Sequence, residues 1–123
     1  MLTLLKINSY RFGEIKIGDK IYTKDVIIFP DHVEGNWWRK EGHSLALEDL
    51  DTVLPPRGSK PDLLLVGTGA YGALKIPTAL IEHLKGLGIE IVSGPTKEIC
   101  EKHKSLASSA KNLTVVTALH LTC

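Results

Sequence analysis

Residues 62–72, which read DLLLVGTGAYG, decide how the fold of this chain is interpreted. The run from Asp62 to Val66 is a short apolar stretch, typical of a strand that is buried on both faces of a parallel sheet. A loop with three glycines follows, namely Gly67, Gly69 and Gly72. Pro77 then suits the first turn of a helix that we expect to reach about Lys85. This stretch therefore predicts a strand, a glycine loop and a helix, in that order.

The segments after this helix repeat the alternation of strand and helix. Ile89–Val92 has the composition of another short buried strand. Thr96 is a residue type that caps helix N-termini, so we expect a second helix from there to about Ala110. The apolar segment Leu113–Leu121 is predicted to be the last strand. A β-α-β-α-β order predicts right-handed crossovers and parallel pairing of these strands.

The first third of the chain has the pattern of antiparallel β structure. Gly18-Asp19 is a turn signal within an alternating apolar pattern over residues 15–22, which predicts a β-hairpin. Val26–Phe29 is a strand-forming run that is stopped by a proline, and Val33–Trp38 is expected to pair beside it. Ser44–Leu54 is expected to begin extended and to end as a short helix.

Composition limits the class of protein. The chain has 123 residues and a mass of 13.5 kDa, the size of one compact domain. Its 43% hydrophobic and 24% charged residues exclude a disordered or fibrous chain. A formal charge of +1 gives no field that favours nucleic acid. Two cysteines, no signal peptide and no membrane-length apolar run predict a cytoplasmic protein that does not bind membranes.

The glycine loop has the form GxGxxG directly after a strand, a pattern that can hold a phosphate with backbone N–H groups. The candidate ligand-binding residues of this region are Gly67, Thr68, Gly69, Tyr71, Gly72 and Lys75. Pro77 argues against a dinucleotide, because it predicts a later helix start than the dinucleotide fingerprint has. A smaller anion or a carboxylate fits the loop at least as well. The alternative is that the glycines only form a tight connection.

Residues 36–43, which read NWWRKEGH, are the second region that draws attention. Adjacent tryptophans in a strand point to opposite faces, so one of Trp37 and Trp38 is expected in the core and the other at a cleft or an interaction surface. Arg39 and His43 would bind an anion beside the glycine loop or move a proton. The alternative is that Arg39 is paired with an acidic residue and that His43 caps a turn.

The sequence predicts no catalytic residue, metal site or cofactor. Its histidines and cysteines lack the spacing of metal ligands, and its serines lack the context of an activated nucleophile. Cys100 lies on the apolar side of a predicted helix, where it is most simply a small core residue. An enzymatic activity is therefore not favoured.

Several short motifs, taken in their order, make the chain resemble a known family. They are Tyr10 with Phe12-Gly13, Phe29-Pro30, Trp37-Trp38-Arg39 with Gly42-His43, Leu65-Val66-Gly67-Thr68-Gly69, Pro77, Gly88-Ile89 and His120-Leu121-Thr122-Cys123. The chain is similar over nearly its whole length to the Mth-domain proteins of unknown function, which include the adipogenesis-associated Mth domain-containing protein and a mitochondrial complex I assembly factor. The resemblance implies a three-layer α/β fold, with a central mostly parallel sheet, helices on one side, and an N-terminal antiparallel β layer plus short helix on the other.

Residues and resemblance together predict one Mth-like domain over residues 1–123, with a β-rich hairpin region at 1–54 and a β-α-β-α-β unit at 62–123. We expect a non-catalytic protein-interaction, assembly or regulatory module whose contact surface includes Trp37 and Trp38. The alternative is a small-molecule or anion-binding protein, or an enzyme, that uses residues 67–72 with Arg39 and His43. The expected partner is thus an unidentified protein or, in the alternative, a small anion. An open edge of the hairpin would also allow a homo-oligomer.

Overall fold

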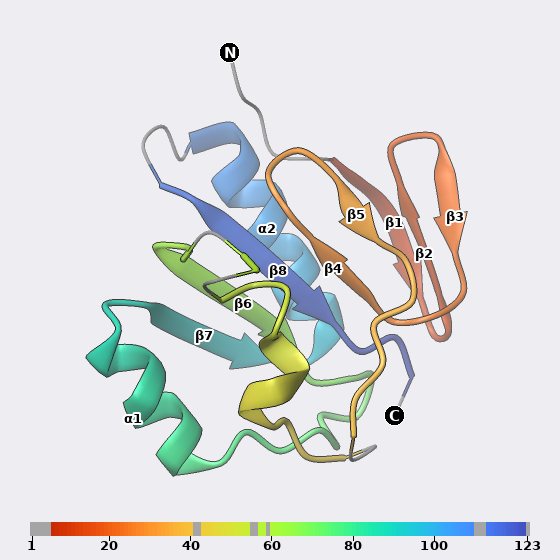
Figure 1. Ribbon diagram of the computed structural model, residues 1–123. Helices are drawn as coiled ribbons and strands as arrows, with labels where there is room; N and C mark the ends of the chain where they lie inside the picture. The colour runs from red at the N-terminus through yellow and green to blue at the C-terminus, as the bar shows by residue number, and fades with distance from the viewer. Residues whose placement is uncertain (1–5, 41–42, 55–56, 59, 110–112, 123) are drawn as a thin grey trace.

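The computed structural model describes residues 6–40, 43–54, 57–58, 60–109 and 113–122 (Figure 1). Its elements are β1 (Ile7–Arg11), β2 (Glu14–Ile17), β3 (Lys20–Tyr22), β4 (Val26–Ile28), β5 (Val33–Glu34), the 3-10 helix η1 (Leu47–Leu50), β6 (Leu63–Gly67), α1 (Thr78–Gly86), β7 (Glu90–Gly94), α2 (Thr96–Ser109) and β8 (Val115–Leu119). Within those ranges, no helix is long and apolar enough to cross a membrane.

The central sheet has five strands in the order β5-β4-β8-β6-β7. β6 pairs in parallel with β7 and β8, but β4 pairs antiparallel with β5 and β8. The prediction of a mostly parallel sheet is therefore wrong on one side, because β4 and β5 join this sheet at β8 instead of staying in the N-terminal layer. Every residue of β6 and β8 is buried, as their continuous apolar sequences predict. Each fully buried leucine of β6 contributes about 1.5–3 kcal/mol to folding.

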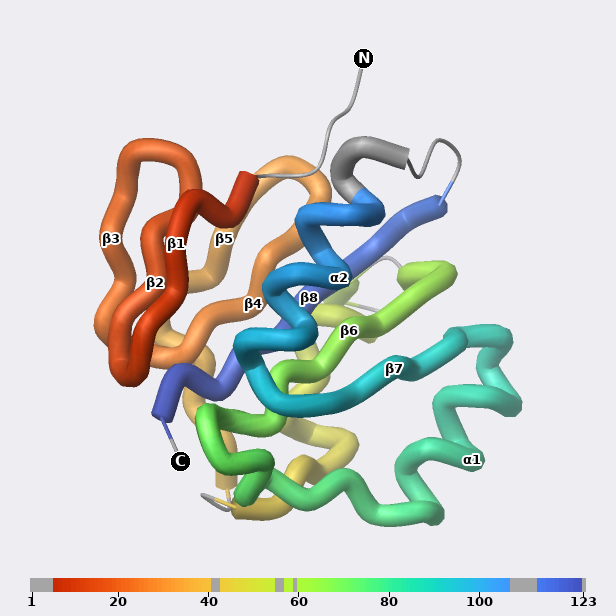
Figure 2. Tube along the Cα trace, turned by 180° about the vertical axis from the view of Figure 1, so that it is seen from behind, coloured from red at the N-terminus to blue at the C-terminus, as the bar shows by residue number. Residues whose placement is uncertain are grey.

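The two α-helices lie on opposite faces of the central sheet. One face carries α1 and η1, whose Leu84 and Leu50 pack with Leu64 of β6. The other carries α2 and the sheet β1–β3, which lie in front of the central sheet in Figure 2. The expectation of both helices on one side is therefore wrong. The chain moves from β6 outward to β7 and then back past β6 to β8, and right-handed crossovers in opposite directions put their helices on opposite faces.

The three-stranded sheet β1-β2-β3 confirms the predicted hairpin. Ile17 of β2 is opposite Lys20 of β3, and Gly18 between them has a φ of +60°. That backbone conformation is accessible to glycine at little cost. Ile15 and Ile17 of β2 point into the core that this sheet shares with α2.

The tryptophan segment is not a strand. β5 ends at Glu34, so the strand predicted for Val33–Trp38 is wrong beyond its second residue. The backbone N–H of Trp37 donates to the carbonyl of Asp25 at 2.8 Å, and its indole Nε1 donates to the carbonyl of Asp49 at 2.9 Å. Trp37 is 7% exposed and Trp38 is 75% exposed. The opposite orientations predicted for the pair are therefore confirmed, although hydrogen bonds to the core impose them instead of a strand's pleat.

Candidate functional site

The glycine loop uses most of its amides inside the protein. Four of them donate to protein oxygens: Thr68 to the carbonyl of Gly94 at 2.8 Å, Gly69 to Oγ1 of Thr96 at 2.8 Å, Ala70 to the carbonyl of Thr122 at 2.9 Å and Gly72 to the carbonyl of Gly69 at 3.3 Å. An anion would have to displace these acceptors before the backbone could hold it. The loop bends at Gly69 and Gly72, whose φ values of +104° and +68° favour glycine.

Thr96 connects this loop to α2 and to the end of β8. Its hydroxyl accepts from the amide of Gly69 and donates to the carbonyl of His120 at 2.6 Å. The expectation that Thr96 caps the helix is wrong, because the amide of Ile99 donates to the carbonyl of Pro95, which puts Pro95 at the capping position. A Cβ at Gly67 would come within 2.8 Å of Oγ1 of Thr96. Close packing therefore explains the first glycine of the loop.

Asp25, Arg39 and His120 form a group that we call the buried charge cluster. Nη1 of Arg39 donates to Oδ2 of Asp25 at 2.7 Å, and Nδ1 of His120 lies 2.8 Å from the same oxygen. The other carboxylate oxygen of Asp25 accepts from the amide of Leu121 at 2.8 Å. The guanidinium of Arg39 also lies over the ring of Trp37, 4.9 Å from its centroid. The predicted pairing of Arg39 with an acidic residue is thus confirmed.

Hydrogen bonds determine the charge of Asp25. Burial alone raises the pKa of this carboxyl group, but hydrogen bonds from His120, the amide of Leu121 and Arg39 outweigh burial and hold the pKa below its ordinary value. The ring atom Nε2 of His120 is buried and has no hydrogen-bond partner within the described part of the chain. The cluster therefore contains an ionised Asp25 carboxylate and, among the described residues, an imidazole nitrogen of His120 without a hydrogen-bond partner.

Three exposed aromatic side chains lie on segments that contact the C-terminal residues 120–122, and we call them the aromatic face: Phe12, Trp38 and Tyr71. Phe12 is 57% exposed and Tyr71 is 83% exposed, and their ring centroids are 6.2 Å apart. Each belongs to a segment that contacts the chain after β8: the amide of Gly13 donates to Leu121, that of Ala70 to Thr122, and Arg39 contacts His120. Figures 1 and 2 both place the β1–β2 turn and the loop after β6 beside the C-terminal segment.

His43 and Lys75 are brought together through their backbones. The amide of Lys75 donates to the carbonyl of His43 at 2.8 Å, and Ser44 pairs with Lys75 in an isolated bridge. Both side chains are exposed, whereas the Arg39 side chain is buried in the charge cluster. The structure therefore does not join Arg39 to His43 and Lys75 in one anion-binding group, and the assignment of the glycine loop as a ligand site stays a prediction.

Other candidate groups are structural or dispersed. Burial raises the pKa of the Cys100 thiol to about 12, so this thiol is an unreactive core group, as predicted. The described residues contain no group of three or more histidine, cysteine or acidic side chains able to hold a metal ion. Asp25 and His120 were not predicted as site residues, because no local pattern marks either of them. They are 95 positions apart and meet only through the pairing of β4 with β8.

Known structures share this arrangement over nearly the whole chain. A conserved hypothetical protein of Pyrococcus horikoshii is 28% identical, with a TM-score of 0.76, over 97% of this chain and 100% of that one. The protein MT938 is 24% identical, with a TM-score of 0.75, over 97% and 99% of the two chains. A Mth938-like domain of Bordetella pertussis is 18% identical, with a TM-score of 0.64, over 95% and 85%.

These likenesses show a shared mixed α/β fold with two sheets and two helices. A family model described as protein of unknown function (DUF498/DUF598) matches residues 7–120. Because this match spans most of the sequence, from β1 to the residue after β8, the chain belongs to that family, whose function is not established.

Proposed function

We propose that this protein is a non-catalytic interaction module and that the aromatic face is its contact surface. The observation that carries the proposal is that Phe12, Trp38 and Tyr71 are each more than half exposed and lie on segments that contact residues 120–122, with the rings of Phe12 and Tyr71 in contact. Large aromatic side chains supply much of the affinity at protein interfaces, since they bury a large area with few rotatable bonds. Aromatic side chains that stay exposed to water do not stabilise a monomer, and a patch of them is typical of an interaction surface.

The buried charge cluster holds the backbone segments that carry this surface. Arg39 follows Trp38 directly and is fixed by Asp25 and His120, and Leu121 is fixed by the same carboxylate. These bonds hold the segments that carry Trp38 and Phe12 before any partner binds, which lowers the ordering cost of association. Resemblance to Mth-domain proteins that act in assembly or regulation supports the same function, and the two cysteines support a reducing, cytoplasmic location.

The test is capture of a partner followed by reconstitution with that partner purified. Trp38→Ala and Tyr71→Ala should each weaken binding about tenfold or more, the loss of one interface hot spot. Sedimentation of the isolated protein tests whether the partner is a second copy of the chain. Both variants should unfold at the wild-type temperature, because neither side chain is part of the core.

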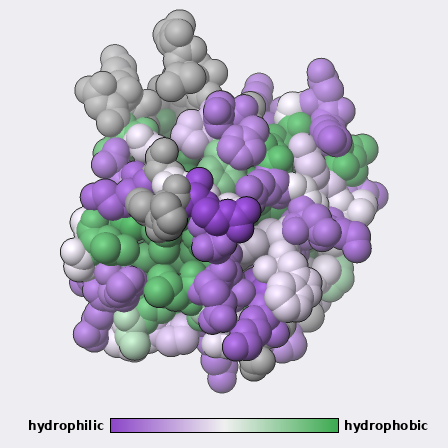
Figure 3. Space-filling view, viewed as in Figure 1, coloured by the Kyte–Doolittle hydropathy of each residue, from purple (hydrophilic) through white to green (hydrophobic). Residues whose placement is uncertain are grey.

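Leu47→Ala and Leu113→Ala are the matched controls, because both leucines are exposed apolar residues elsewhere on the surface. Leu47 lines a separate apolar cleft of about 610 Å³ with Leu54 and Leu87, and Figure 3 shows hydrophobic side chains gathered on the side of α1 and β7. Binding that survives both aromatic substitutions but is lost with either leucine variant would reject the aromatic face.

A further inference from the structure

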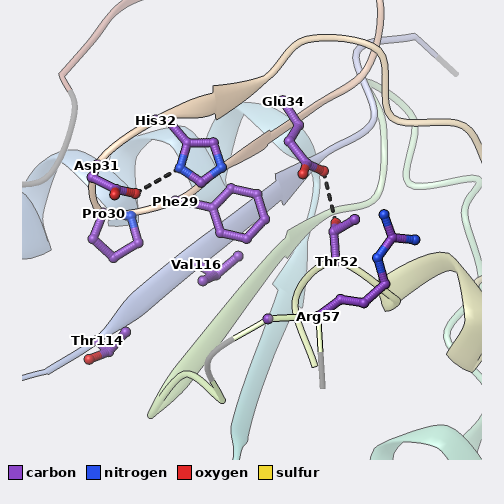
Figure 4. Close-up of a pocket in the computed structure, with 10 residues that line it drawn as sticks. Phe29, Pro30, Asp31, His32, Glu34, Thr52, Arg57, Thr114 and Val116 are labelled. Carbon is purple, nitrogen blue, oxygen red and sulfur yellow. Dashed lines mark hydrogen bonds and ion pairs between the residues drawn. The ribbon is translucent and has the colours of Figure 1, made fainter. Parts of the chain in front are cut away.

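A cleft of about 580 Å³ lies between the β4–β5 turn and the segment after η1, over the start of β8 (Figure 4). This volume is in the range of small-molecule pockets. Phe29 and Pro30 supply apolar surface over the buried Val116. The polar groups come from Asp31, His32, Glu34, Thr52 and Arg57. None of these residues belongs to the aromatic face or to the buried charge cluster. The cleft is therefore a separate candidate site.

The polar end of the cleft carries opposite charges that are already held in position. Oε1 of Glu34 accepts from the hydroxyl of Thr52 at 2.8 Å, which leaves Oε2 available to a second donor. Nη1 of Arg57 donates to Asp51 at 2.8 Å, and the planar guanidinium has four further N–H groups. In Figure 4 the Glu34 carboxylate and the Arg57 guanidinium lie on the same side, opposite Phe29 and Pro30.

Gly58, next to Arg57, packs tightly against the segment after η1. The amide of Gly58 donates to the carbonyl of Leu54 at 2.8 Å. A Cβ at Gly58 would clash with the backbone of Val53, so only glycine permits this approach. The backbone beside Arg57 is thus held against Val53 and Leu54, and the guanidinium pairs with Asp51.

The apolar end is a stacked pair of rings. The rings of Phe29 and His32 are nearly parallel, with an interplanar angle of 4° and centroids 4.4 Å apart. Nδ1 of His32 is held 2.7 Å from Oδ1 of Asp31, which keeps the imidazole over the phenyl ring. This ring pair and Pro30 form one wall of the cleft, above Val116.

We propose that this cleft binds a free α-amino acid with an apolar side chain. The ammonium group of such a ligand bonds Glu34, its carboxylate bonds Arg57, and its side chain packs against Phe29 and Pro30. An α-amino acid carries both charges on one carbon with the apolar group beyond it, which matches two opposite charges at one end of the cleft and apolar surface at the other. This site is independent of the proposed interaction surface, so either assignment can fail alone.

The test is an NMR titration of the full chain with leucine, isocaproate and isoamylamine, which share one apolar group and differ in their charged groups. Leucine should cause saturable shifts of the Glu34, Thr52, Gly58 and Val116 amides at millimolar concentration, and each analogue should bind about tenfold more weakly. Absence of shifts with leucine, or equal affinity for isocaproate, overturns the proposal.

Two substitutions locate the charges that recognise the ligand. Glu34→Gln should remove the preference for leucine over isocaproate, and Arg57→Gln should remove the preference for leucine over isoamylamine. Arg11→Gln is the matched control, because Arg11 forms a similar exposed ion pair, 3.2 Å from Glu14, away from the cleft. Variants that unfold like the wild type yet keep both preferences place leucine elsewhere and overturn the assignment.

Discussion

The glycine loop and the buried charge cluster lie next to each other but differ in how they are built. Residues 67–72 form one contiguous motif that is conspicuous in the sequence. Three of their amides donate to other parts of the protein and a fourth donates within the loop. Asp25, Arg39 and His120 come from three separate segments, and their polar side chains are buried against one another. Packing thus accounts for the hydrogen bonds of a conspicuous motif, while the buried polar cluster shows no motif in the sequence.

His120 joins the two regions. Its amide donates to the carbonyl of Gly67 at 3.0 Å, its carbonyl accepts from Thr96, and its side chain contacts Asp25 and Arg39. The backbone of His120 therefore bonds to the loop, while its side chain belongs to the cluster. Substitutions on either side separate what each contributes.

The largest expected effect comes from removing the charge of Asp25. Asp25→Asn keeps the shape of the side chain but leaves Arg39 buried beside a neutral group, which should lower the free energy of unfolding by about 3 kcal/mol. Urea denaturation measures this change. Asp31→Asn is the control, because Asp31 forms a similar pair with His32 at the surface and should leave the midpoint unchanged. An equal loss of unfolding free energy in both variants would show that burial does not make the Asp25 pair more stabilising than the exposed one.

Gly67→Ala should be the next largest effect. Its Cβ would meet the Leu119 side chain and Oγ1 of Thr96 at 2.8 Å, so β6 or α2 must shift, at a cost of about 1–3 kcal/mol. Thermal and urea unfolding both report this loss. Gly86→Ala is the control, because nothing lies within 4 Å of a Cβ there and alanine favours the helix. Wild-type stability of Gly67→Ala would show that the loop is not tightly packed.

Gly72→Ala should cost about 1 kcal/mol through backbone conformation alone. The φ of +68° at Gly72 is unfavourable for residues with a Cβ, while the nearest atom to that Cβ would be 3.7 Å away. Urea unfolding of Gly72→Ala and Gly72→Asn distinguishes the causes. Asparagine tolerates this conformation better, so it should recover part of the loss, whereas a steric cause predicts a larger loss for asparagine.

Acid should weaken the cluster before it affects the loop. Because the folded-state pKa of Asp25 is lowered, the unfolded chain takes up a proton first as the pH falls. The stabilisation by Asp25 is fully present above its unfolded pKa of about 3.9 and is lost as the pH falls through the folded value. Urea midpoints between neutral and acidic pH should therefore fall less steeply for Asp25→Asn than for the wild type.

Phosphate should produce the smallest effect. The amides of Thr68, Gly69, Ala70 and Gly72 already donate within the protein, so their NMR signals should not shift saturably at millimolar phosphate. Saturable shifts confined to these amides would show that the loop opens to hold an anion, as the GxGxxG pattern predicts. That result would also favour a ligand-binding function over the interaction module.

Local signals predicted most of the elements but not their arrangement. Gly18-Asp19, the run 62–66 and Pro77 each placed an element within a few residues of where it lies, because turn chemistry and apolar periodicity act over short stretches. The strand predicted for the tryptophan segment failed because hydrogen bonds from Trp37 to Asp25 and Asp49 replaced strand pairing. The charge of Arg39 suggested an acidic partner, but nothing nearby in the sequence identified Asp25.

The sequence by itself determined the buried strands β6 and β8, the hairpin, the two helices and the opposite exposure of Trp37 and Trp38. Only the tertiary structure decided that the helices lie on opposite faces, that β4 extends the central sheet, and that Asp25 meets His120 across 95 positions. The physical reason is range: propensity and periodicity are read within one element, whereas strand order and buried charge pairing depend on which distant segments exclude water together.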